Sequence, residues 1–225
     1  MAVQFRCESY AYPGYRKRWQ AVIGIVDYGM GNIKAFSNIY KQLDIPHRII
    51  TSKEHFKDVE KIILPGVGAF DHAMMRLGES GLLETLNDLV LNKKKPVLGI
   101  CVGMQMMAKS SEEGILGGLG WIDATVNKFN KGELGGDRPL PHMGWNSVNH
   151  IVSNPLFKDI DANSRFYFLH SYYFKPERKE CSIALAEYGD QFTCATSRDN
   201  IFGVQFHPEK SHHNGMKLLK NFSNL

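Results

Sequence analysis

The first half of the chain alternates short apolar runs with segments of helical periodicity, and this order strongly limits the possible folds. Residues 33–43 repeat apolar side chains at helical spacing, and residues 82–91 form a second helical segment. The strand-like runs around them are residues 22–26, 49–50, 62–64 and 97–100. This βαβ order predicts an α/β fold with a mainly parallel sheet and helices on both faces. Functional groups are then expected beyond the carboxyl ends of the strands.

The second half of the chain is richer in strand-forming residues. Five runs contain β-branched and aromatic side chains, and these are residues 124–129, 165–169, 183–186, 192–195 and 201–205. A Gly-rich and charged stretch, residues 130–138, is expected to form an exposed hairpin or loop. Leu218, Leu219 and Phe222 indicate a closing helix. We therefore expect a β-rich portion added to the parallel sheet.

Length and charge limit the organisation and the partners of the chain. Its 225 residues suit one well-buried domain rather than two. Most of the net charge of +4 lies before Gln20, where four basic residues accompany one acidic residue. We therefore assign residues 1–20 to an N-terminal extension, expected to be disordered, and residues 21–225 to one domain without a basic groove for nucleic acid. An organelle transit peptide and a start codon assigned too far upstream remain alternatives for the extension.

The sequence also argues against a membrane segment and a metal site. Residues 1–20 lack the continuous apolar stretch of a secretory signal or a membrane span. The four cysteines, Cys7, Cys101, Cys181 and Cys194, are scattered and form no close pair of the kind that binds zinc. Reduced thiols are expected, which predicts a cytoplasmic protein.

Cys101 lies between an apolar strand and a helical stretch that begins near Gly103. Glycines on both sides of it are what a sharp strand-to-helix turn needs, because the central residue is strained and close neighbours cannot carry Cβ atoms. A helix that starts just behind the thiol favours the thiolate and offers free amides to an oxyanion. A buried core cysteine is the alternative interpretation. The flanking glycines favour a nucleophile.

His207 follows the strand-like run 201–206, and Pro208 ends that strand. A histidine fixed by a proline and followed by Glu209 has the composition of a general base that a carboxylate orients. Alone, this segment would more often be a surface junction between a strand and a turn. Together with Cys101 it predicts a nucleophile, a base and an orienting carboxylate.

The residues around these two sites resemble a known family. Residues 99–105 (GICVGMQ) and 206–209 (FHPE) are similar to the class I, triad-type glutamine amidotransferases. Residues 27–32 (DYGMGN), 65–70 (PGVGAF) and 141–146 (PHMGWN) narrow the resemblance to the glutaminase subunits of imidazole glycerol phosphate synthases, from about residue 21 onward. The resemblance implies a flavodoxin-like fold and hydrolysis of glutamine by Cys101, His207 and Glu209 in histidine biosynthesis. No cofactor or metal is implied.

The resemblance also implies roles for other residues. The amides of Gly68 and Val102 are expected to form the oxyanion hole. Substrate-binding roles fall on Gln105, Glu113, His170, Ser171 and Tyr172. Trp145, Tyr167 and Lys210 are expected where the chain meets a (β/α)8-barrel cyclase in a heterodimer, around the ammonia passage.

Three alternatives remain at this stage. The first is an ammonia donor of the same family for another synthase, such as a surface-sugar amidating enzyme, since Val102 stands where the family usually has leucine. The second is a cysteine peptidase or thioesterase, which Gln105 and Glu113 disfavour. The third is a non-catalytic binding module, which would be expected to lack a triad member.

Overall fold

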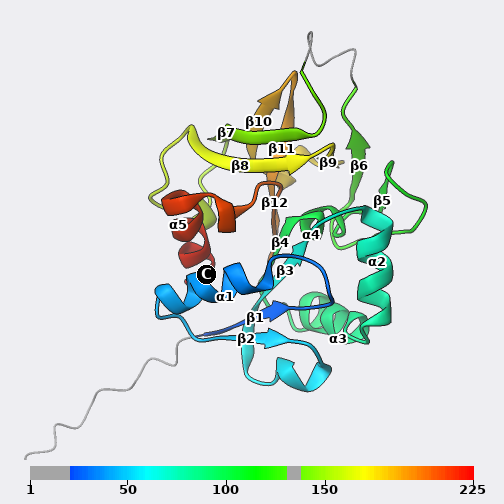
Figure 1. The fold of residues 1–225 in the computed structure, drawn as a ribbon, viewed down its shortest axis with the longest axis vertical. Coiled ribbons are helices and arrows are strands. Elements are labelled where there is room, and N and C mark those ends of the chain that lie inside the picture. The colour runs from blue at the N-terminus through cyan, green and yellow to red at the C-terminus, as the bar shows by residue number, and fades with distance from the viewer. Residues whose placement is uncertain (1–20, 131–137) are drawn as a thin grey trace, which may run out of the picture.

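The computed structural model describes residues 21–130 and 138–225. The expectations for residues 1–20, and for most of the stretch 130–138, lie outside these ranges. One continuous sheet runs through the described chain, with parallel strands at one end and antiparallel strands at the other (Figure 1).

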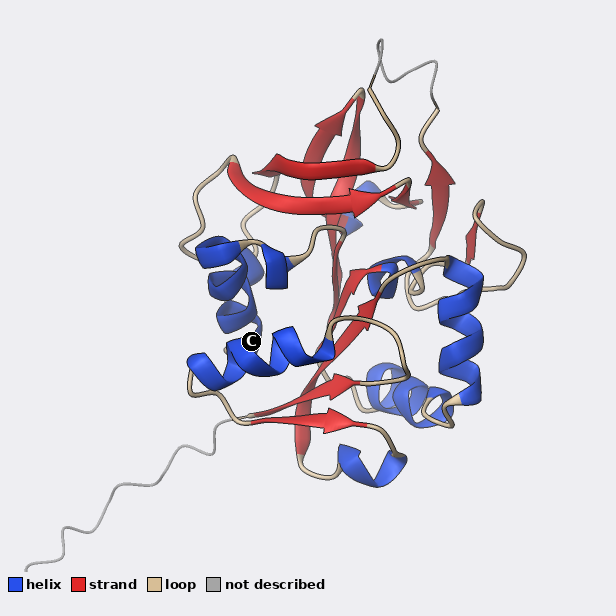
Figure 2. Ribbon diagram, viewed as in Figure 1, coloured by secondary structure: helices blue, strands red, loops and turns tan. Residues whose placement is uncertain are grey.

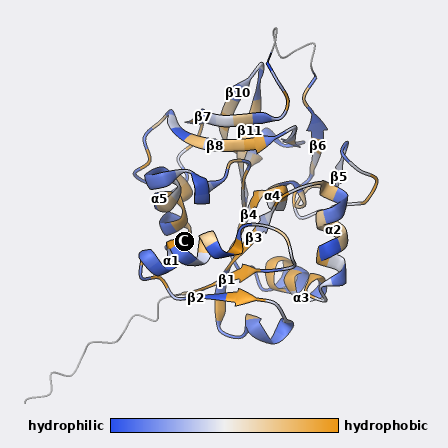
Figure 3. Ribbon diagram, in the orientation of Figure 1, coloured by the Kyte–Doolittle hydropathy of each residue, from blue (hydrophilic) through white to orange (hydrophobic). Residues whose placement is uncertain are grey.

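The parallel strands form the half of the sheet that the apolar runs predict. Their order is β2 (His47–Ile50), β1 (Val22–Val26), β3 (Val59–Gly66), β4 (Val97–Cys101) and β12 (Ile201–Val204), and every neighbouring pair is parallel. Continuous apolar runs suit β1, β3, β4 and β12 because both faces of these strands are largely buried, whereas β2 lies at the edge and is partly exposed. Figure 3 shows the apolar character of β1 by its hydrophobic colouring.

Helices pack on both faces of the parallel strands, as predicted (Figure 2). On one side lie α1 (Ile33–Gln42) and α5 (His212–Ser223), where the Tyr40 hydroxyl of α1 donates to the Leu219 carbonyl of α5 at 3.4 Å. On the other lie α2 (Phe70–Glu79) and α3 (Leu83–Asn87), and α3 continues as a π-helical turn over Asp88–Asn92. The sequence analysis identified all of these except α2.

The β-rich portion continues the same sheet with antiparallel strands. Next to β12 follow β11 (Asp190–Arg198), β10 (Ser182–Tyr188), β7 (His142–His150) and β8 (Ser164–His170). A branch contains β9 (Tyr172–Pro176), β6 (Ala124–Lys128) and β5 (Ser110–Ser111). The predicted β-rich portion is therefore confirmed, although β5, β7 and β9 were not foreseen.

Short helical turns complete the described chain. They are Lys53–Phe56, Pro155–Phe157, Lys179–Cys181 and Pro208–Lys210, together with α4 (Val102–Gln105). Within residues 21–130 and 138–225, no helix has the length and apolar character that crossing a membrane requires.

Candidate active site

The chain turns sharply at Cys101, where β4 ends and α4 begins. Cys101 has φ 56° and ψ −114°, a strained conformation for a residue with a side chain. The turn packs closely against β3, since a Cβ on Gly103 would lie 1.9 Å from the Leu64 carbonyl oxygen. A Cβ on Gly99 would lie 2.6 Å from the Gly103 carbonyl oxygen. The glycines around Cys101 thus allow the turn that the sequence predicts.

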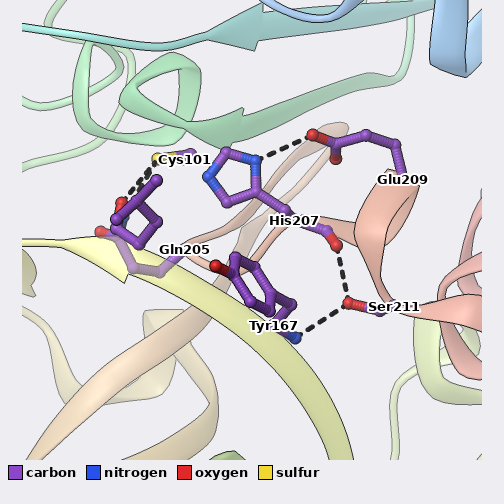
Figure 4. A network of polar contacts seen from close by, with 7 residues as sticks. Cys101, Tyr167, Gln205, His207, Glu209 and Ser211 are labelled. Atoms are coloured by element: carbon purple, nitrogen blue, oxygen red, sulfur yellow. Dashed lines mark hydrogen bonds and ion pairs between the residues drawn. The ribbon is translucent and has the colours of Figure 1, made fainter. Parts of the chain in front are cut away.

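His207 lies beyond β12, with its ring between Cys101 and Glu209 (Figure 4). Its Nδ1 is 2.9 Å from Glu209 Oε1, and the two side chains are 4% and 2% exposed. A carboxylate accepts the proton on Nδ1, so Nε2 is left to exchange a proton with sulfur. Burial lowers the pKa of His207, but side-chain hydrogen bonds with Cys101 and Glu209 and the charges of both outweigh burial and raise the pKa to about 10.

The backbone on both sides of His207 is fixed to β8. The His207 amide donates to the Tyr167 carbonyl at 2.8 Å. The Ser211 hydroxyl donates to the His207 carbonyl at 2.6 Å and accepts from the Tyr167 amide at 3.0 Å (Figure 4). The imidazole is therefore carried by a segment with little freedom to move.

Gln205 is a site residue that the sequence analysis missed. Its side chain is fully buried, with Nε2 3.8 Å from Cys101 Sγ and Oε1 accepting from Gln105 Nε2 at 3.0 Å (Figure 4). The sequence held one indication of this role. Gln205 precedes His207 by two residues in an otherwise apolar run, and the alternation of side chains along a strand places both on one face. The amide of Gln205 can donate toward a thiolate at Cys101.

A pocket of about 340 Å³ opens at Cys101. Most of the residues predicted for the site line it, and these are Gly68, Cys101, Val102, Gln105, Glu113, His170, Ser171, Tyr172, His207 and Lys210. Glu209 lies behind His207. One wall of the pocket is formed by residues at the ends of the parallel strands, and the other by the segment that joins β8 to β9.

The loop between β3 and α2 is held at both ends and exposed in the middle. The Tyr28 hydroxyl donates to the Pro65 carbonyl at 2.7 Å, and burial and the charge of Cys101 raise the pKa of Tyr28. At the other end, Glu113 Oε2 accepts from the Phe70 amide at 2.8 Å. Between them Gly68 has φ +81° beside the pocket. Tyr28 was also missed as a site residue, although its motif was noted.

Trp145, Tyr167 and Lys210 form one surface cluster next to the pocket. The ring centroids of Trp145 and Tyr167 are 6.2 Å apart, and Lys210 Nζ lies 5.5 Å from the Tyr167 ring centroid. Trp145 is 38% exposed and its neighbour Met143 is 62% exposed. Only Lys210 of the three lines the pocket.

In the part of the chain that the structure describes, no group of three or more His, Cys, Asp or Glu side chains is arranged to hold a metal ion. The arrangement at Cys101 suits acyl transfer instead: a nucleophile, a base and its carboxylate lie in one line beside a pocket.

Comparisons with known proteins agree with this chemistry. Residues 25–224 match the family described as glutamine amidotransferase class-I. A protein from Leptospira borgpetersenii named imidazole glycerol phosphate synthase subunit HisH is 54% identical over 204 residues, which cover 91% of this chain and 100% of that protein. The protein of the same name from Bdellovibrio bacteriovorus is 56% identical over 204 residues, with the same coverage.

Solved structures support the fold. A structure described as a glutamine amidotransferase superposes with a TM-score of 0.68 at 17% identity, covering 91% of this chain and 100% of the other. A glutamine amidotransferase from Thermotoga maritima gives a TM-score of 0.59 at 18% identity, covering 84% of this chain and 76% of the other. The chain therefore belongs to the class-I glutamine amidotransferases and, within them, to the imidazole glycerol phosphate synthase HisH subunits.

Proposed function

We propose that this chain hydrolyses glutamine to glutamate and ammonia, as the glutaminase subunit of an imidazole glycerol phosphate synthase. The observation that carries this proposal is the position of Cys101, strained at a strand end, beside a buried His207 that Glu209 orients at 2.9 Å. The names of the HisH relatives support the assignment to this synthase, and the geometry supports the roles that we propose for the residues.

The proposed reaction is a two-step acyl transfer. The Cys101 thiolate attacks the carboxamide carbon, and the amides of Gly68 and Val102 stabilise the oxyanion that forms. His207 gives a proton from Nε2 to the leaving nitrogen, which departs as ammonia, and a γ-glutamyl thioester remains on sulfur. Water, deprotonated by His207, then attacks the thioester and releases glutamate and the thiolate. Glu209 holds the imidazole in the tautomer that both steps need.

The pocket offers groups for the rest of glutamine. Glu113 uses Oε2 for the Phe70 amide, and its carboxylate charge can still pair with the α-ammonium group. The 170–172 segment would meet the α-carboxylate. The Gln105 amide nitrogen donates hydrogen bonds to the Tyr172 carbonyl and to Gln205 Oε1. We therefore propose that Gln105 shapes the pocket wall through these bonds.

A barrel partner is part of the proposal. We place a (β/α)8-barrel cyclase on the surface formed by Trp145, Tyr167 and Lys210, because aromatic side chains beside a cation are typical anchors of an interface. Ammonia would then leave the pocket past Lys210. Cys101, Cys181 and Cys194 are free thiols, which suits a reducing cytoplasm.

Replacing Cys101 tests the assignment. In the complex with the cyclase, Cys101→Ala should abolish synthesis from glutamine and leave synthesis from added ammonium salts nearly intact, because the thiol makes ammonia and does not use it. Cys181→Ala, which removes a buried thiol outside the pocket, should keep both activities. Loss of both activities in Cys101→Ala would contradict the ammonia-donor assignment.

A further inference from the structure

Two buried histidines outside the catalytic set face each other across β7 and β8. His142 and His170 are paired in the register of these strands and are 3% and 6% exposed. His142 Nδ1 lies 3.0 Å from His170 Nε2. The His142 ring is stacked between Phe168 and Tyr188, at centroid distances of 4.8 and 4.1 Å. Stacking on both sides fixes the plane of this ring.

The hydrogen-bond partners fix the tautomer of each ring. His170 Nδ1 is 2.8 Å from the Tyr172 carbonyl oxygen, which can only accept, so the proton of His170 is on Nδ1. His170 Nε2 is then an acceptor, and His142 must carry its proton on Nδ1. His142 Nε2 in turn accepts from the Asn146 amide at 3.3 Å. Donation runs in one direction, from Asn146 through His142 and His170 to Tyr172.

This direction of hydrogen-bond donation requires both imidazoles to be neutral. Burial lowers the pKa of His170 to about 3, and the nearby His142 and His207 add to this effect. Burial and the charge of Arg138 lower the pKa of His142 to about 4. Neither ring carries a proton beyond its Nδ1 hydrogen near neutral pH.

This series of hydrogen bonds ends on the wall of the catalytic pocket. The Tyr172 carbonyl accepts from His170 and also from Gln105 Nε2 at 3.1 Å, so both of its lone pairs are used. Gln105 also donates to Gln205, whose amide lies beside Cys101 Sγ. Tyr172, Gln105 and His170 all line the pocket, whereas His142 does not.

We propose that His142 is a positioning residue for glutamine binding: by donating to His170 it fixes the His170 tautomer, which holds the Tyr172 carbonyl and with it the substrate-facing wall of the pocket. Cys101 is fixed by the turn after β4, and the His207 backbone is fixed by Tyr167 and Ser211. None of these contacts involves the side chain of His142 or His170, so we expect the triad geometry to persist when the link between the two histidines is lost. The inference rests on the proposed glutaminase function and adds a residue to it that does not touch the substrate.

Three variants of β7 test this role in the complex with the cyclase. His142→Phe keeps a ring between Phe168 and Tyr188 but has no donor, whereas His142→Asn keeps a donor near the position of Nδ1. His150→Phe is the matched control, because it makes the same replacement on the same face of β7, where the His150 ring packs against Phe157 at 4.2 Å.

The expected result is a separation of KM from kcat. His142→Phe should raise the KM for glutamine about five- to tenfold, the effect of one lost hydrogen bond in the pocket wall, and change kcat by less than about twofold. His142→Asn should recover most of the affinity, and His150→Phe should match the wild type. An unchanged KM in His142→Phe, or an equal rise in His150→Phe, would overturn the proposal.

A second measurement does not depend on activity. Nitrogen-15 NMR of the histidine-labelled full chain near neutral pH should show neutral rings with the proton on Nδ1 at His142 and His170. An Nε2-protonated or charged His170 would overturn the inference even if the wild type hydrolyses glutamine. Conversely, a wild-type complex with the expected tautomers and no glutaminase activity would contradict the proposed function alone.

Discussion

His207 and Glu209 have different tasks at the residue scale, and their variants should differ. His207→Ala removes the proton carrier and should cost about 100- to 10,000-fold in glutamine turnover by the complex. Glu209→Ala removes only the group that orients the ring, so its loss should be smaller. Glu209→Gln, which keeps an oxygen acceptor for Nδ1, should lie closest to the wild type.

Folding must be checked in the same variants. Glu209 Oε2 is buried without a hydrogen-bond partner among the described residues, so His207→Ala leaves a buried carboxylate without its main counterpart. Thermal unfolding of each variant separates lost stability from lost catalysis. Equal catalytic losses in folded His207→Ala and Glu209→Ala would mean that Glu209 does more than orient the ring.

The sequence could indicate some site residues and not others for a physical reason. Cys101, His207 and Glu209 stand in local patterns of glycine and proline whose backbone consequences can be deduced without a structure. Gln205 acquires its place only because β12 pairs with β4, which brings its side chain to Cys101. The link between His142 and His170 likewise depends on the register of β7 and β8.

At the scale of elements, the contact between β3 and the Cys101 turn depends on Gly103. Gly103→Ala would force a methyl group against the Leu64 carbonyl oxygen and should lower the free energy of unfolding by about 3 kcal/mol or more. Gly78→Ala is a matched control in the exposed part of α2, where the added Cβ meets no atom within 4 Å, and it should stabilise by about 0.5–1 kcal/mol. Urea unfolding measures both. Similar stabilities for the two variants would contradict this account of the turn.

Two of the elements that the sequence analysis missed, β7 and α2, have a weak apolar signal. In β7 the inward positions include His142, Gly144 and Asn146, so the strand lacks the apolar alternation that marks a half-buried strand. In α2 only Phe70, Ala73 and Leu77 are buried. Tertiary packing and a histidine pair, rather than an apolar face, hold β7 in place, and neither can be deduced from local periodicity.

At the scale of the whole molecule, the catalytic pocket joins the two halves of the sheet. The nucleophile and its base come from the ends of parallel strands, whereas residues 169–172 supply a wall from the antiparallel portion. Pro65, Cys101 and His207 come together at one edge of the sheet because β3, β4 and β12 are parallel neighbours, as expected for groups at the carboxyl ends of such strands. The β-rich portion thus contributes directly to the substrate site.

The same arrangement leads us to expect that the isolated chain is a poor glutaminase and that its partner activates it. Tyr28 and Glu113 anchor the two ends of the 65–70 loop, so a change of conformation is confined to the exposed residues 67–69 between them. Gly68 lets an amide turn toward or away from the oxyanion at little steric cost. If the proposed barrel partner docks on the Trp145 cluster and favours the competent conformation, about 1 to 3 kcal/mol of coupling changes the affinity of the competent state about 5- to 150-fold.

Glutamate release by the purified chain, with and without the proposed cyclase partner, measures this activation. Trp145→Ala should reduce the activation because it removes the exposed anchor of the cluster, whereas Met75→Ala, which trims an exposed apolar residue on α2, should retain it. Full turnover by the chain alone would show that residues 67–69 already present the oxyanion amides. The proposed interface would then serve only to pass ammonia, and Trp145→Ala would uncouple glutamine hydrolysis from synthesis without slowing glutamate release.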